Sequence, residues 1–147
     1  SNISNIFDGT QKAYIYIWVS KKEKFIYIGE TNEKRGSFGR ARAHIGDAGT
    51  LRKQVEGRVG ERLESIDDLN LLTFLLPEEP KYTSIESTYR ESIEYLVQIR
   101  LLEKRAICNP TFKIISNVRT SVRTTESSVK KIADQIVEGF LETFLGL

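Results

Sequence analysis

The fold is decided by residues 13–29, which read AYIYIWVSKKEKFIYIG. Two apolar runs rich in β-branched and aromatic residues, at 13–19 and 24–29, flank a short charged stretch. Such runs favour β-strands, and a connection of this length is typical of a hairpin loop. Side chains alternate along a strand, so Tyr14 and Tyr16 share one face of the expected hairpin. Tyr27 then lies near Tyr16 across the ladder.

The rest of the chain alternates helical and extended patterns around this hairpin. Helices are expected from residue 37 or 38 to 45, over 50–63, over 84–104 and from residue 127 or 128. Residues 69–76 are expected to form a buried strand, and residues 112–115 a short extended piece. This order predicts an α+β fold, with a small antiparallel sheet of about three strands flanked by helices. We divide the chain into a lead-in (1–12), a principal domain (13–115) and a helical extension packing on the same domain (116–147).

The composition is that of a soluble globular domain. The chain has 147 residues, of which 39% are hydrophobic and 29% charged. No apolar run approaches the roughly 20 residues that span a bilayer, so no membrane partner is expected. The single cysteine, Cys108, excludes an internal disulfide framework and a cysteine zinc cluster. A reducing, cytoplasmic compartment is the simplest interpretation.

Basic residues are concentrated between residues 34 and 62, where eight of them stand against three acidic residues. By itself, such a run is more typical of a solvated helical face. An excess of this kind also suits a polyanion. Four of these residues are candidate nucleic-acid contacts: Arg35, Arg42, Arg52 and Lys53.

Candidate catalytic groups follow the hairpin. Arg40 and His44 are four residues apart and share one face of the predicted helix. Phosphodiester hydrolysis needs a group that orients or deprotonates water and positive charge on the developing phosphorane. It usually also needs a divalent cation held by a carboxylate. Phenol, guanidinium, imidazole and carboxylate side chains supply these functions.

The hairpin resembles that of the GIY-YIG nuclease family. Tyr27 follows Tyr16 by eleven residues, which is the usual family spacing. The second motif, Tyr27-Ile28-Gly29, is intact, whereas Tyr14 stands where the first motif has glycine. The resemblance covers roughly residues 13–110. It implies a GIY-YIG nuclease-like fold and a metal-dependent endonuclease. The substrate that it implies is DNA, with RNA as the alternative, and association with a nucleoid is compatible with this function.

The resemblance also implies catalytic residues beyond the hairpin. Arg40 and His44 match the arginine and histidine of the family's next helix, with Arg42 as the competing arginine. The family carries a metal-binding glutamate on a later helix, followed by an asparagine, which Asn109 matches. The expected helix offers three glutamates, and we favour the one that Asn109 follows by fifteen residues. The three are Glu86, Glu91 and Glu94, of which Glu94 is favoured.

In the implied mechanism Glu94 holds one Mg²⁺, with Mn²⁺ as the alternative cation. Tyr16 accepts a proton from the attacking water or orients it. Because a free phenol has a pKa of about 10, this role requires nearby cations. Arg40 stabilises the transition state. The remaining residues position water or phosphate, or brace the site by hydrogen bonding: Tyr27, His44 and Asn109.

Two other classes of function remain open. The first is a non-catalytic nucleic-acid-binding module with the same fold, in which the tyrosines are ordinary sheet residues. The second is a protein-interaction domain that uses the terminal helix. The apolar stripe of that helix is either core or a self-association face, which leaves a homodimer open: Phe140, Leu141 and Phe144.

Overall fold

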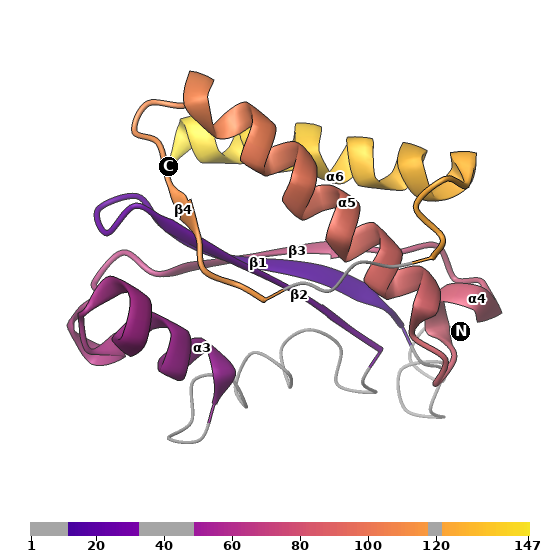
Figure 1. Ribbon diagram of the computed structural model, residues 1–147, viewed down its shortest axis with the longest axis horizontal. Coiled ribbons are helices and arrows are strands. Elements are labelled where there is room, and N and C mark those ends of the chain that lie inside the picture. Colours follow the sequence, from indigo (N-terminus) through magenta and orange to yellow (C-terminus); the bar gives the residue numbers. More distant parts are fainter. Residues whose placement is uncertain (1–11, 33–48, 118–121) are drawn as a thin grey trace, which may run out of the picture.

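A four-stranded mixed sheet lies between helices on both of its faces (Figure 1). The computed structural model describes residues 12–32, 49–117 and 122–147. The strands are β1 (Tyr14–Ser20), β2 (Phe25–Thr31), β3 (Asn70–Leu75) and β4 (Lys113–Ile114), in the order β3-β1-β2-β4. On one face lie α5 (Thr88–Lys104) and α6 (Ser127–Gly146), and on the other α3 (Thr50–Gln54). The α+β class predicted from the sequence is confirmed.

The sheet differs from the expected one at its edges. Strand β1 pairs antiparallel with both β2 and β3, but β4 is a fourth strand and runs parallel to β2. The expectation of a purely antiparallel sheet of about three strands is therefore wrong. The chain leaves α5, passes a 3₁₀ turn (Arg105–Ile107) and returns alongside β2 in the direction of β2. Its two strand residues are too few to show a sheet period in the sequence.

Strand β3 is also less buried than its apolar sequence suggests. Leu75 is 55% exposed, and no residue of β3 is fully buried. The reason is its position, because in the order β3-β1-β2-β4 the strand β3 is a sheet edge. The prediction of a buried strand over 69–76 is wrong in burial, although the strand itself is present.

Two helices differ from the predicted ones in where they begin or end. The helix expected over 50–63 is α3 followed by a π-helical turn (Val55–Val59), which Gly60 ends with a φ of 82°. A short α4 (Pro80–Thr83) precedes α5, so α5 begins at Thr88 rather than at residue 84. The carboxylate of Glu86 accepts a 2.8 Å hydrogen bond from the Thr88 backbone N–H and so caps α5 there.

The hairpin contributes to two separate cores. Its isoleucines and Val19 face α5 and α6, where the ring of Phe112 packs edge-on against Phe140 and Phe144. The opposite face packs against α3 and holds four aromatic side chains: Tyr16, Trp18, Phe25 and Tyr27. Burial on both faces explains why the hairpin runs are almost continuously apolar. Phe140 and Phe144 of the terminal helix are therefore core residues.

Among the described residues, no helix is both long and apolar enough to cross a membrane.

The turn of the hairpin is clamped by Asp68, which precedes β3. Its carboxylate accepts hydrogen bonds from Ser20 Oγ at 2.5 Å and from the Lys22 backbone N–H at 3.0 Å. Burial raises the pKa of Asp68, but these hydrogen bonds outweigh that effect and hold the pKa below its ordinary value. The folded state is therefore favoured by the ionised carboxylate.

We predict that Asp68→Ala lowers stability by about 1 kcal/mol at neutral pH, which is about 2–4 °C in melting temperature. Because the pKa of Asp68 is depressed on folding, its contribution is present above the unfolded pKa and lost as the pH falls through the folded one. The gap between variant and unaltered protein should thus begin to narrow at about pH 5 and close as the pH falls through the lowered folded pKa.

Thermal unfolding at several pH values measures this gap. The control is Asp67→Ala, because Asp67 makes only an exposed ion pair with Lys22 and should matter less. A gap that persists in acid would contradict the account.

Candidate active site

A pocket of about 290 Å³ lies beside β2, in the part of the strand that β4 does not cover. Strand β4 pairs only with Phe25 and Ile26, and the pocket begins with the next residue, Tyr27. Its lining comes from both cores and from several segments of the chain. The lining residues are Tyr16, Tyr27, Ile28, Gly29, Glu30, Thr50, Glu91, Glu94 and Asn117.

Tyr16 lies across Gly29. The two residues are partners in the β1–β2 ladder, and a Cβ atom added to Gly29 would lie 2.2 Å from Cζ and 2.3 Å from the hydroxyl oxygen of Tyr16. No side chain fits in that space, so glycine is required for the ring to reach the pocket. Tyr16 is only 1% exposed and Tyr27 only 6% exposed, so both rings are held by packing.

Two of the three candidate glutamates lie at this pocket. Glu91 and Glu94 are three residues apart on α5 and both line it, with Glu91 exposed and Glu94 half-buried. Glu86 does not line it, because its carboxylate accepts hydrogen bonds from the side chain and backbone of Thr88. These bonds lower the pKa of Glu86 below its ordinary value. Of the three candidates, Glu91 and Glu94 therefore line the pocket together with the tyrosines, as does Glu30 of β2.

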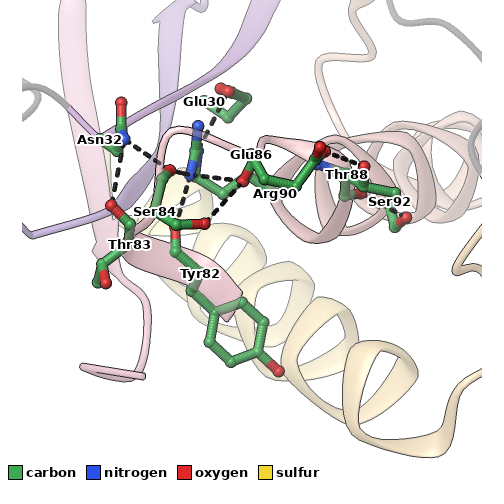
Figure 2. Close-up of polar contacts among 9 residues, drawn as sticks. All are labelled: Glu30, Asn32, Tyr82, Thr83, Ser84, Glu86, Thr88, Arg90 and Ser92. Carbon is green, nitrogen blue, oxygen red and sulfur yellow. Dashed lines mark hydrogen bonds and ion pairs between the residues drawn. The ribbon is translucent and has the colours of Figure 1, made fainter. Parts of the chain in front are cut away.

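A buried arginine fixes α5 against β2 (Figure 2). Arg90 is 3% exposed, and its Nε donates to Oε1 of Glu30 at 3.2 Å. Its Nη1 donates to the backbone carbonyls of Tyr82 at 2.7 Å and Ser84 at 2.6 Å. One guanidinium therefore joins the end of β2 to the segment that precedes α5.

Asn32 strengthens the same junction. Its Nδ2 donates to the carbonyls of Thr83 at 3.1 Å and Ser84 at 2.7 Å (Figure 2). The end of α4 and the segment that leads to α5 are thereby held on the end of β2. Because Glu91 directly follows Arg90, this junction sets where the two pocket glutamates lie.

The asparagine at the pocket is Asn117, not Asn109. Asn109 is exposed and follows the 3₁₀ turn at the carboxyl end of α5, away from the pocket lining. Asn117 comes eight residues later, after β4 has carried the chain along β2. Its Oδ1 accepts a 3.0 Å hydrogen bond from Nη2 of Arg58. The sequence analysis did not assign Asn117 or Arg58 to the site, because only the path of β4 brings Asn117 to the pocket.

The basic candidates have different surroundings. Arg52 makes ion pairs with Glu64 at 2.5 Å and with Glu56 at 3.3 Å, so its charge is largely compensated. Lys53 is exposed. The other predicted basic residues lie outside the described residues: Arg35, Arg40, Arg42 and His44.

The pocket suits a hard divalent cation. Three carboxylates line it, of which Glu30 is bound by Arg90, so Glu91 and Glu94 are the candidate oxygen ligands. Within the described ranges, no group of three or more His, Cys, Asp or Glu residues is placed to hold a metal ion. Mg²⁺ is usually held by one or two carboxylates together with water and substrate phosphate. The residues present therefore fit Mg²⁺ shared with a phosphate ligand.

Comparisons with protein-family models, curated proteins and solved structures find no match to this chain.

We predict that Gly29→Ala destabilises the protein by about 1–3 kcal/mol, because its Cβ would overlap the Tyr16 ring. Gly57→Ala is the matched control, since a Cβ there meets nothing within 4 Å. Urea unfolding of both variants measures the difference. In a double-mutant cycle, Gly29→Ala should cost less in the Tyr16→Ala background than in the unaltered protein, because the ring it overlaps is gone. Equal stability of the two glycine variants would refute the close approach.

We predict that Arg90→Gln costs about 3–5 kcal/mol, because it leaves Glu30 and several carbonyls without their buried partner. The control on the same helix is Arg100→Gln. Arg100 pairs with the exposed Asp134 and should contribute at most about 1 kcal/mol. Chemical denaturation of both variants compares the two costs, and a similar cost for both would contradict the role given to Arg90.

Proposed function

We propose that the protein is a metal-dependent endonuclease that hydrolyses phosphodiester bonds in DNA. The observation that carries the proposal is the shared pocket of Tyr16, Tyr27 and Glu94. These residues come from two strands and a helix. In the sequence, most of the principal domain lies between Tyr16 and Glu94, yet both line one pocket. A structural role in the sheet explains each tyrosine singly, but not why both reach one polar pocket with a carboxylate.

Each residue has a role that its position supports. The Tyr16 hydroxyl, held over Gly29, orients the attacking water, or takes its proton when the phenol is ionised. Tyr27 and the Asn117 amide, which line the same pocket, orient water or phosphate. Glu94, together with Glu91, would hold the cation. What a divalent cation supplies at such a site is neutralisation of charge on the scissile phosphate and leaving oxygen.

Positive charge for the transition state comes from two sources in this proposal. Arg58 reaches the pocket rim through Asn117 and is exposed, so its remaining N–H groups face solvent. Arg40 and His44 are assigned by the resemblance to the GIY-YIG family, Arg40 at the transition state and His44 beside the phosphate. Such fixed cations stabilise a phosphorane more in a water-excluded site than in bulk water.

The test is nicking of a supercoiled plasmid in the presence of Mg²⁺. We expect Tyr16→Phe and Glu94→Gln to lower the rate about 10²- to 10⁴-fold, and a chelator to abolish it. Tyr14→Phe and Glu103→Gln are matched controls on β1 and α5, because neither residue lines the pocket. The controls should nick like the unaltered protein.

Glu91→Gln, compared with Glu94→Gln, identifies which carboxylate carries more of the cation binding. Duplex binding should survive in every variant. Binding without nicking by the unaltered protein, on DNA and RNA and with both Mg²⁺ and Mn²⁺, would instead establish a non-catalytic nucleic-acid-binding module.

A further inference from the structure

A second pocket, of about 710 Å³, lies at the other end of β2, beside the β1–β2 turn. Its floor is apolar and includes Phe112 and Leu102. One acidic residue, Glu23, lines it together with three basic residues. These three form what we term the cation cluster: Lys24, Arg105 and Lys113.

Backbone hydrogen bonds bring the cation cluster together from three segments. The Lys24 carbonyl accepts from the Lys113 backbone N–H at 2.8 Å, which joins the hairpin turn to β4. The Arg105 carbonyl accepts from Thr111 Oγ1 at 2.9 Å, which joins the end of α5 to the approach to β4. The cluster is thus a product of the fold rather than of one basic stretch of sequence.

Within the described part of the chain, no ion pair neutralises the charges of the cluster. None of its three side chains forms an ion pair there, whereas the nearby Lys22 pairs with Asp67 at 3.0 Å. Like charges around one pocket repel one another, and a bound anion relieves that repulsion. The cluster therefore favours an anionic ligand.

The cluster is connected to the candidate active site by one short segment. Lys113 lines the second pocket and Asn117 lines the active-site pocket. Four residues of chain, which begin with the two residues of β4, span at most about 13 Å. DNA advances about 3.4 Å per nucleotide along its axis, so this distance corresponds to about four base pairs. Arg58, bonded to Asn117, continues the positive charge at the active-site end.

We propose that the phosphate backbone of the DNA substrate runs along residues 113–117, and that the cation cluster binds phosphates about four base pairs from the scissile bond. This rests on the proposed function, because the scissile bond is placed in the pocket of Tyr16 and Glu94. The cluster contributes affinity and register rather than sequence preference, as phosphate contacts do.

The test compares two variants with the same change in net charge. Lys24→Gln/Lys113→Gln removes two charges of the cluster, and Lys130→Gln/Lys131→Gln removes two exposed charges from the start of α6. The affinity for a labelled duplex of about 20 base pairs is measured between about 50 and about 200 mM salt. Loss of two phosphate contacts should reduce the slope of log K against log salt by about two in the cluster variant. The control variant should keep the slope of the unaltered protein.

An unchanged slope in the cluster variant would overturn the proposal. So would weakened binding of polyglutamate by that variant with duplex binding unchanged, because the cluster would then hold an acidic peptide. Plasmid nicking is measured in parallel to separate the two proposals. If the protein nicks the plasmid but the slope is unchanged, the proposed phosphate path is refuted and the proposed nuclease activity stands. If the slope is reduced but the plasmid is not nicked, residues 113–117 remain a proposed binding surface and the nuclease activity is refuted.

Discussion

The candidate site depends on the packing of the Tyr16 ring across Gly29. In most ladder pairs two side chains lie next to each other. Here the Tyr16 ring also fills the space that a side chain on residue 29 would occupy. The ring is held by the core on the α3 side, and the hydroxyl is brought to the uncovered part of β2. A tyrosine ordered in this way loses little entropy when it acts, which is what positioning of a catalytic group requires. The same constraint gives the glycine of the second motif a physical role independent of any family.

The second requirement is that α5 present its glutamates to the tyrosines across the edge of the sheet. The Arg90 guanidinium provides this connection, because it binds Glu30 on β2 and the carbonyls that precede α5 (Figure 2). A buried ion pair is seldom a large net source of stability. Its value here is geometric, since Nε binds Glu30 while Nη1 binds the carbonyls of Tyr82 and Ser84, and these contacts together fix α5 on the hairpin. Arg90 and its neighbour Glu91 thus have different tasks, one in placing the helix and one at the pocket.

The hairpin could be predicted from sequence because its signals are local. Alternation and the charged turn placed both strands within two residues of β1 and β2, and helical spacing placed Glu94 on α5.

Features that depend on distant segments could not be predicted. Glu30 and Arg90 are sixty residues apart, and nothing local marks them as partners. Asn109 was predicted because it comes soon after the expected helix, whereas the path of β4 brings Asn117 to the pocket. The exposure of β3 follows from its place at the sheet edge, which its apolar sequence does not encode.

The central claim is that the tyrosines of the hairpin and the glutamates of α5 form one cation-dependent phosphate site. Anomalous diffraction from crystals soaked with Mn²⁺ and a short DNA duplex tests it most directly. The account predicts a Mn²⁺ ion bound by Glu94, with or without Glu91, and a DNA phosphate between that ion and Tyr16. An ion bound at Glu86 or elsewhere, with no phosphate at the tyrosine pocket, would contradict it.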